Sequence, residues 1–206
     1  MIKVPYEGKV ALAYHHLDKG GEPDPYWDDA THGLQALLLT NLPRNSAHKT
    51  LTDLGSSKGK WPALLSPYFD QIVSIEPNDD HRHFQERLLD MLKIENIDLY
   101  GDEMPGSIKK MHAQAALLID ALPRAQDWLM SYRMLLDDDF LQWIAIAQGI
   151  SDDPLSNKSK MTQGDQWRML EMAEERGWSA VLFDVDKDAP MIMGDAADRW
   201  LLLLER

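Results

Sequence analysis

Short apolar runs separated by amphipathic stretches organise most of this chain. From residue 49 onward, runs rich in Leu, Ile, Val and Ala recur between polar segments. Runs of this kind, bounded by turn residues, predict buried β-strands. The predicted strands span residues 51–54, 71–75, 97–100, 115–119, 140–147, 180–183 and 200–204.

Between these strands, apolar residues recur at helical spacing. The clearest case is the segment 81–94, where Phe84, Leu88, Met91 and Leu92 share one helical face. The other predicted helices span residues 27–39, start at 61–65, and span 128–136 and 166–176, with Gly177 placed to cap the last one.

Alternation of strands and helices predicts an α/β fold. Nearly continuous apolar strands are typical of a parallel sheet that is covered by helices on both faces. The connection between the last two strands, residues 184–198, lacks a helical face and suits a hairpin, so the last strand should run antiparallel. We therefore expect a three-layer sandwich around a seven-stranded, mostly parallel sheet.

Composition narrows the class of protein. The chain has 206 residues and is 44% hydrophobic, with no apolar run approaching the roughly 18 residues that span a membrane. No secretory signal is visible at the start, which favours the cytoplasm. The absence of cysteine excludes disulfides, thiolate metal sites and a cysteine nucleophile.

The charge bears on the partners of the protein. Its 34 acidic and 21 basic residues leave a formal charge of −13, and the basic residues are scattered. Proteins that grip a phosphate backbone usually present a field of Lys and Arg. A nucleic-acid partner is therefore disfavoured.

A glycine-containing turn follows the first predicted strand. The chain reads Asp53-Leu54-Gly55-Ser56-Ser57-Lys58-Gly59, and Glu76 closes the next apolar run 23 positions after Asp53. Small residues let the chain reverse tightly and let a ligand touch its backbone. A carboxylate at this separation lies where open α/β sheets hold the hydroxyls of a nucleoside ribose.

The turn and Glu76 together resemble the cofactor-binding core of the class I S-adenosylmethionine-dependent methyltransferases. A nicotinamide fingerprint would need glycines at positions 55, 57 and 60, and here the last two are Ser57 and Lys60. The resemblance covers roughly residues 30–206. It implies a methyltransferase domain over 30–206 and S-adenosylmethionine as the cofactor.

The resemblance also implies roles for individual residues. The loop would wrap the methionine end of the cofactor, Asp53 would receive its amino group, and Glu76 would accept from the ribose hydroxyls. Ser57 replaces a position that is most often glycine, and it fits if its φ is negative. The residues assigned to the cofactor are Asp53, Gly55, Ser56, Ser57, Gly59, Glu76, Pro77, Asp102, Glu103 and Asp120, with Pro77 on the adenine face and Asp102 at the adenine amino group.

Fewer residues are candidates for binding the methyl acceptor or for removing its proton. Asp120 follows the fourth predicted strand and is a candidate to orient or deprotonate an acceptor; alternatively it caps a helix beginning at Pro123 or Arg124. His15 is the other candidate for a catalytic base. His81 and His83 stand at a spacing that points their rings apart on a helix, so no metal site is expected.

The segment 1–29 precedes the sheet and carries several aromatic residues and His15. Added N-terminal segments commonly close the site in small methyltransferases, so we expect a lid over the carboxyl ends of the first and fourth strands. The alternative is an arm that packs elsewhere or mediates dimer contact.

Three functions remain open at this point. The leading hypothesis is methyl transfer to a small-molecule acceptor, and the second is a catalytically silent, methyltransferase-like binding module. The third is an RNA methyltransferase, in which Lys49 and Asp120 would be the first two members of a Lys-Asp-Lys-Glu tetrad. The strand at 140–147 offers no lysine for the third member.

Overall fold

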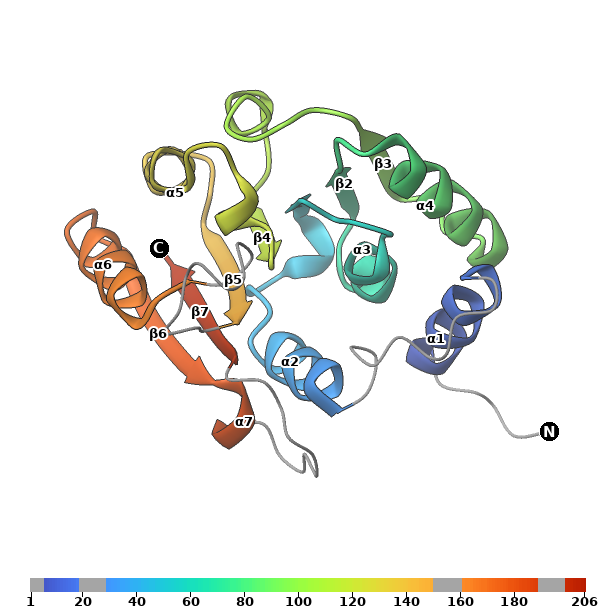
Figure 1. Cartoon of the computed structure of the whole chain (residues 1–206), viewed down its shortest axis with the longest axis horizontal. Helices are drawn as coiled ribbons and strands as arrows, with labels where there is room; N and C mark the ends of the chain where they lie inside the picture. The colour runs from blue at the N-terminus through green and yellow to red at the C-terminus, as the bar shows by residue number, and fades with distance from the viewer. Residues whose placement is uncertain (1–5, 19–28, 150–160, 189–198) are drawn as a thin grey trace.

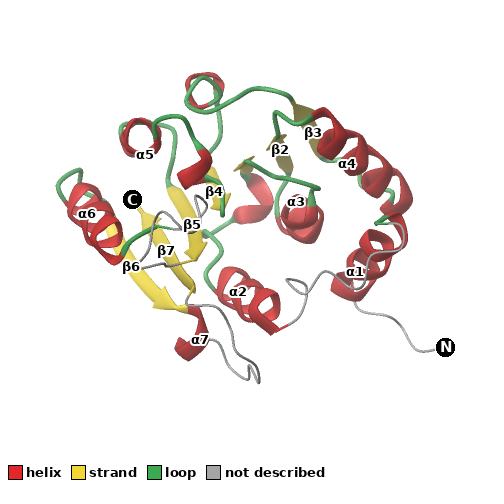
Figure 2. Ribbon diagram, in the orientation of Figure 1, coloured by secondary structure: helices red, strands yellow, loops and turns green. Residues whose placement is uncertain are grey.

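A computed structural model describes residues 6–18, 29–149, 161–188 and 199–206. Within these residues, helices and strands alternate along the chain and build an α/β sandwich (Figures 1 and 2). The helices are α1 (Tyr6–Leu17), α2 (Asp29–Thr40), α3 (Lys60–Leu65), α4 (Asp79–Leu92), α5 (Trp128–Leu136), α6 (Gln163–Glu174) and the single turn α7 (Val185–Asp188). The strands are β1 (Thr50–Leu54), β2 (Gln71–Ile75), β3 (Ile97–Tyr100), β4 (Ala115–Ile119), β5 (Trp143–Gly149), β6 (Ser179–Asp184) and β7 (Arg199–Glu205). Short 3₁₀ turns are η2 (Ser46–His48), η3 (Ser66–Tyr68), η4 (Ile108–Lys110) and η5 (Leu122–Arg124).

The described strands form one seven-stranded sheet in the order β3-β2-β1-β4-β5-β7-β6. Strands β1 to β5 pair in parallel, whereas β7 runs antiparallel to both β5 and β6. The predicted sandwich with an antiparallel last strand is confirmed. The strand order reverses between β1 and β4, and that is where open α/β sheets form their ligand crevice, outside the carboxyl ends of the strands.

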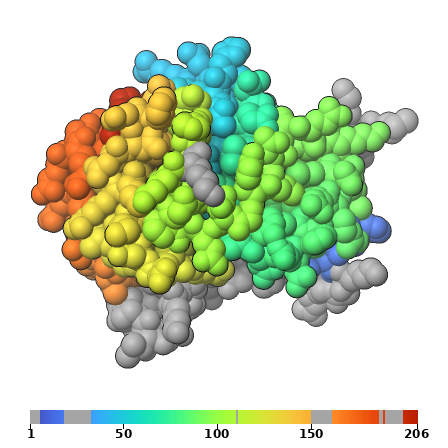
Figure 3. Space-filling model, turned by 90° about the horizontal axis from the view of Figure 1, so that it is seen from above, coloured from blue at the N-terminus to red at the C-terminus, as the bar shows by residue number. Residues whose placement is uncertain are grey.

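Each face of the sheet is covered by its own set of helices. One apolar cluster joins η4, α5 and α6 to one face, and the other joins α2, α3, α4 and α7 to the opposite face (Figure 1). Alternate residues of a strand feed the two clusters, as Ile144 and Ala145 of β5 do. Seen from above, the segment between β3 and β4 covers the surface between α4 and α5 (Figure 3).

Helix α1 was not predicted from the sequence. It packs outside the sandwich on α3 and α4, where Val10, Tyr14 and Leu17 are buried against Ala63 and Leu88 (Figure 1). The buried residues of α1 form one narrow face of the helix, and the residues before it contain no clear N-terminal capping signal. Both features make the helix hard to recognise from the sequence.

Most predicted boundaries agree with the structure to within a few residues. The largest shifts are three residues, in α6, which begins at Gln163 rather than at residue 166, and in β5, which begins at Trp143 rather than at residue 140. The Asp138 carboxylate accepts hydrogen bonds from the backbone N–H groups of Phe140 (2.8 Å) and Leu141 (3.3 Å), and this turn keeps both residues out of the ladder. Residues 1–5 and 19–28 of the expected N-terminal lid lie outside the described residues. No helix in the described part of the chain has the length and apolar character needed to cross a membrane.

Candidate functional site

The turn between β1 and α3 requires glycine at two places. Gly55 and Gly59 have φ angles of 77° and 79°, in the left-handed region that disfavours other residues. A Cβ atom at Gly55 would lie 2.6 Å from the Cβ of Ala121, and one at Gly59 would lie 2.7 Å from the Cγ of Gln85. The turn therefore approaches both the end of β4 and helix α4 closely.

Ser57 also adopts a left-handed conformation, with φ of 50°. The condition under which serine would fit without strain, a negative φ, is not met, because the turn keeps the geometry of a glycine at this position. Two hydrogen bonds hold the strained residue. Its N–H donates to Oε2 of Glu76 (2.7 Å), and its carbonyl accepts from Nε2 of Gln85 (2.5 Å).

A buried polar network lies beneath the turn. The hydroxyls of Ser56 and Ser74 are 2.7 Å apart, and the Gln85 amide contacts both, through Oε1 to Ser74 (2.7 Å) and through Nε2 to Ser56 (2.9 Å). All three side chains are buried. Gln85 thus positions the turn from α4, a role with no local signal in the sequence because its partners lie 11 and 29 residues away.

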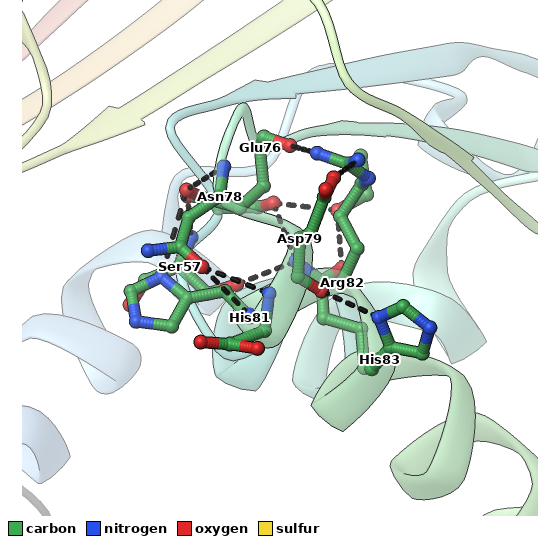
Figure 4. Close-up of polar contacts among 11 residues, drawn as sticks. Ser57, Glu76, Asn78, Asp79, His81, Arg82 and His83 are labelled. Atoms are coloured by element: carbon green, nitrogen blue, oxygen red, sulfur yellow. Dashed lines mark hydrogen bonds and ion pairs between the residues drawn. The ribbon is translucent and has the colours of Figure 1, made fainter.

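Glu76 lies at the carboxyl end of β2 and is only 7% exposed (Figure 4). Its two carboxylate oxygens each accept one backbone N–H, Oε2 from Ser57 (2.7 Å) and Oε1 from Asn78 (3.0 Å). A carboxylate oxygen has two lone pairs, so each oxygen keeps one acceptor site. The carboxylate of Glu76 can therefore accept one further hydrogen bond on each oxygen, as two adjacent hydroxyl groups would require.

His81, in the first turn of α4, is a neighbour of Glu76 that sequence reasoning did not assign to the site. Its Nδ1 lies 3.5 Å from Oε1 of Glu76, an ion-pair contact when the ring is protonated, and makes no hydrogen bond among the described residues. Figure 4 shows the His81 and His83 rings on different sides of the helix, and Nδ1 of His83 contacts the carbonyl of Asp79 at 2.8 Å. Among the described residues, no group of three acidic or histidine side chains is arranged to hold a metal ion.

Asp53 lies in β1 beneath the turn and is 2% exposed. Burial, with a further contribution from the negative charge of Glu76, raises the pKa of its carboxyl to about 8. Its Oδ2 has no hydrogen-bond partner in the described part of the chain. A buried, unpaired carboxyl of this kind is suited to receive a cationic donor.

The residues predicted to contact adenine follow the same edge of the sheet. The Glu76 N–H donates to the carbonyl of Tyr100 (2.9 Å), so the end of β3 lies beside Glu76. Asp102, two residues further on, is half-buried, whereas Glu103 and Pro77 are exposed. This edge brings Asp102 close to Glu76 in the fold.

Asp120 does not cap a helix, and that expectation is wrong. The 3₁₀ turn that follows begins after Ala121 without a side-chain cap, and α5 begins at Trp128 with Asp127 as its N-cap. Asp120 is instead held with φ of 52° at the end of β4, and its Oδ2 lies 2.7 Å from Nη2 of Arg199. Arg199 starts β7, and sequence reasoning missed it because 79 residues separate the partners.

The two remaining candidates lie away from this edge. His15 is exposed on α1. Lys49 precedes β1 at the amino end of the sheet and donates to Gln142, whereas Asp120 follows β4 at the carboxyl end. Since a strand rises about 3.3 Å per residue, roughly 20 Å separates them along the sheet, so they cannot share one tetrad.

Comparison with known proteins identifies the fold. No protein-family model matches the chain, and no curated protein matches it either. Many solved structures are similar. One is a SAM-dependent methyltransferase from Aquifex aeolicus, with 12% identity, a TM-score of 0.63, and coverage of 93% of this chain and 97% of that one.

Two further structures are similar over comparable lengths. A putative O-methyltransferase from Klebsiella pneumoniae has 12% identity, a TM-score of 0.61, and coverage of 100% of this chain and 92% of that one. An rRNA methylase from Streptococcus thermophilus has 16% identity, a TM-score of 0.58, and coverage of 85% and 93%. The chain therefore has the class I, Rossmann-like methyltransferase fold.

Proposed function

We propose that this protein is an S-adenosylmethionine-dependent methyltransferase that acts on a small-molecule acceptor. The observation that carries the proposal is the pairing of Glu76 with the glycine turn at the reversal of strand order. Glu76 is buried and keeps one acceptor site on each oxygen, beside a turn of small residues in which Gly55 is half-buried and Ser57 is exposed. A nucleoside with a flexible cationic tail fits this combination.

Each group of assigned residues would contact a different part of the cofactor. Glu76 would hold the ribose hydroxyls, and Pro77, Asp102 and Glu103 would flank the adenine. Asp53 would receive the cationic amino group, which would lower the pKa of its carboxyl and release a proton on binding. Gly55, Ser56, Ser57 and Gly59 would line the methionine part, and Asp120 would lie at its far end.

When bound, the cofactor supplies a methyl carbon made electrophilic by its sulfonium, and the acceptor's lone pair displaces the sulfur. The chain's contribution is to hold the acceptor atom in line with that carbon, which is positional catalysis. The Asp120 carboxylate is held by Arg199. A carboxylate fixed in this way can orient an acceptor hydroxyl or amine by accepting its hydrogen bond.

Calorimetric titration with S-adenosylmethionine and S-adenosylhomocysteine tests the proposal. Glu76→Ala should weaken binding by about 1–3 kcal/mol, because a ribose hydroxyl then loses its acceptor. Glu86→Ala is the control, since Glu86 is exposed on the same helix that follows Glu76. Absence of binding at millimolar ligand would contradict the proposal.

A silent binding module is the second candidate, favoured by the ion pair that engages Asp120. Cofactor binding without turnover over a broad panel of acceptors would support it. The RNA alternative loses the tetrad considered for it, because Lys49 and Asp120 lie at opposite ends of the sheet.

A further inference from the structure

Two buried polar side chains near the carboxyl edge of the sheet have unpaired hydrogen-bonding groups. Gln148 is fully buried and Trp200 is 2% exposed. Within the described residues, neither amide atom of Gln148 nor Nε1 of Trp200 has a hydrogen-bond partner. Buried polar groups are nearly always paired, so two of them at one place call for an explanation.

The two side chains are direct neighbours across the sheet. Gln148 of β5 is the register partner of Trp200 of β7, so both project from the same face, with Cβ atoms about 5 Å apart. The next register pair outward is Gly149 and Arg199, and Arg199 binds Asp120 at the end of β4. The pair therefore lies one register position inward from Arg199, whose side chain projects from the opposite face of β7 to that of Trp200.

The position of this pair complements that of the glycine turn. The strand order reverses between β1 and β4; the turn and Glu76 lie on the β1–β2 side, and Gln148 and Trp200 lie on the β5–β7 side. A crevice at the reversal is bordered by both halves of the sheet. If one half holds the cofactor, the other half borders the place of the second substrate.

Two other buried indoles and one other buried amide in the described chain are paired, whereas the buried hydroxyls of Thr52 and Ser107 are not. The indole N–H of Trp178 donates to the carbonyl of Leu136 (3.1 Å), and that of Trp143 donates to the carbonyl of Asn41 (3.1 Å). The buried amide of Gln85 binds three partners. Buried indole and amide groups with a structural role are thus hydrogen-bonded in this fold.

Building on the proposed function, we propose that Gln148 and Trp200 form the polar recognition site for the methyl acceptor. They offer three N–H donors, two from Gln148 and one from Trp200, and one carbonyl acceptor. A carbonyl oxygen can accept from both residues while an adjacent N–H donates to Oε1 of Gln148. The acceptor is therefore a neutral planar molecule with a lactam or a primary carboxamide.

A carboxylate fits this pair less well. It has no donor for Oε1 of Gln148, and it would bring a charge into a fully buried place. Arg199, which precedes Trp200 in β7, is already paired with Asp120. Recognition by the pair should accordingly discriminate amides from acids of the same shape.

The first experiment measures thermal unfolding without any ligand, so it does not depend on the proposed function. Gln148→Met removes unpaired polar atoms at similar volume and should raise the melting temperature by about 2 °C or more. Gln85→Met, the matched control, should lower it. Trp200→Phe should lower it by several degrees less than Trp178→Phe, because only Trp178 loses a hydrogen bond. Equal losses in each matched pair would show that Gln148 and Trp200 are already bonded, and would overturn the proposal.

The second experiment measures binding of defined probes to the protein saturated with S-adenosylhomocysteine. In ¹H–¹⁵N spectra, 2-pyridone and nicotinamide should shift the indole N–H signal of Trp200, which is assigned by its loss in Trp200→Phe. Benzoate and methyl benzoate should not shift it. Gln148→Met should weaken amide binding at least tenfold while leaving the affinity for S-adenosylhomocysteine unchanged.

The outcomes separate the two proposals. If S-adenosylhomocysteine binds but no amide probe shifts the Trp200 signal at about 10 mM, the acceptor site is wrong and the methyltransferase stands. A shift with benzoate equal to that with nicotinamide would also overturn the amide assignment. If S-adenosylhomocysteine itself fails to bind, the proposed function fails, and the unfolding experiment alone decides whether the polar pair is unsatisfied.

Discussion

Ser57 illustrates how a single residue is held in an unfavourable conformation by its neighbours. A left-handed conformation costs a residue with a Cβ atom roughly 1–2 kcal/mol. The N–H of Ser57 donates a hydrogen bond to Glu76, and the Ser57 carbonyl accepts one from Gln85. The first of these hydrogen bonds also orients the Glu76 carboxylate, so the strained residue helps to position the candidate ribose site.

Replacing Ser57 by glycine should relieve this strain. We expect Ser57→Gly to raise the free energy of unfolding by about 0.5–1 kcal/mol, measured by urea denaturation, because glycine adopts φ of 50° without a Cβ clash. Ser57→Ala is the control and should give no gain, since it retains the Cβ. A less stable Ser57→Gly variant would show that the serine hydroxyl contributes more than the strain costs.

Asp53 should make stability depend on pH. The pKa of its carboxyl is about 8 in the folded protein, against an ordinary value of 3.8, so between these pH values the folded state holds a proton that the unfolded state has lost. The stability that this group contributes is complete below about pH 4 and falls as pH rises toward 8, by up to roughly a few kcal/mol.

Urea unfolding at pH 5 and pH 8 measures this effect. The wild-type protein should lose more stability between the two pH values than Asp53→Asn, which cannot ionise. Asp70→Asn serves as the control, because Asp70 is exposed. Equal losses in the wild type and in Asp53→Asn would contradict a raised pKa.

At the scale of elements, α1 ties the N-terminal segment to the cofactor side of the molecule. Tyr6 at its start donates to the carbonyl of Ala63 (2.8 Å), and Asp18, just after its end, binds Lys58 in the glycine turn (2.6 Å). The helix therefore runs alongside α3 and ends next to the turn. The contact with the turn at one end of α1 is consistent with the expected lid over the carboxyl ends of β1 and β4, and we propose this role for residues 1–29.

Deletion of residues 1–24 tests the lid. We expect the truncated protein to stay folded by circular dichroism but with lower stability, because the apolar surface around Ala63 and Leu88 is exposed. Cofactor affinity should change little, whereas turnover should fall at least tenfold. Lys58→Met, which only breaks the link to Asp18, controls for the loss of stability. A truncated protein with full activity would show that the segment is no lid.

At the scale of the whole molecule, the charge of −13 bears on the class of acceptor. Such a field repels a polyanion, and association with nucleic acid depends on neutralising phosphates with Lys and Arg. The similarity to an rRNA methylase concerns the fold and does not change this balance.

The charge predicts that RNA will not bind. Fluorescence anisotropy with a labelled single-stranded RNA of about 20 nucleotides should show no saturation at micromolar protein in 150 mM salt. The titration should be repeated with S-adenosylhomocysteine present, which controls for a site that forms only in the loaded protein. Saturable binding that weakens steeply with salt would favour the RNA alternative.

What the sequence determined by itself was the fold class, and it also pointed to the glycine turn and Glu76, which we propose hold the cofactor. Strand and helix patterns are local, with periods of two and 3.6 residues, so they can be recognised without knowing the contacts. The glycine turn and Glu76 are likewise local in their signals, since each follows its own strand. The antiparallel last strand followed from the composition of one connection.

Tertiary structure alone decided which distant residues meet. Gln85 and Ser56, Asp120 and Arg199, and Gln148 and Trp200 are brought together by strand order and helix packing, across separations that leave no periodic trace. The same reason explains the error on Asp120, because a capping role was inferred from the residues that follow it in the sequence. The tetrad of Lys49 and Asp120 was considered from a family resemblance, without the strand directions that place the two residues at opposite ends of the sheet. The acceptor half of the site is built from such long-range pairs, so it emerges only when the strands are placed side by side.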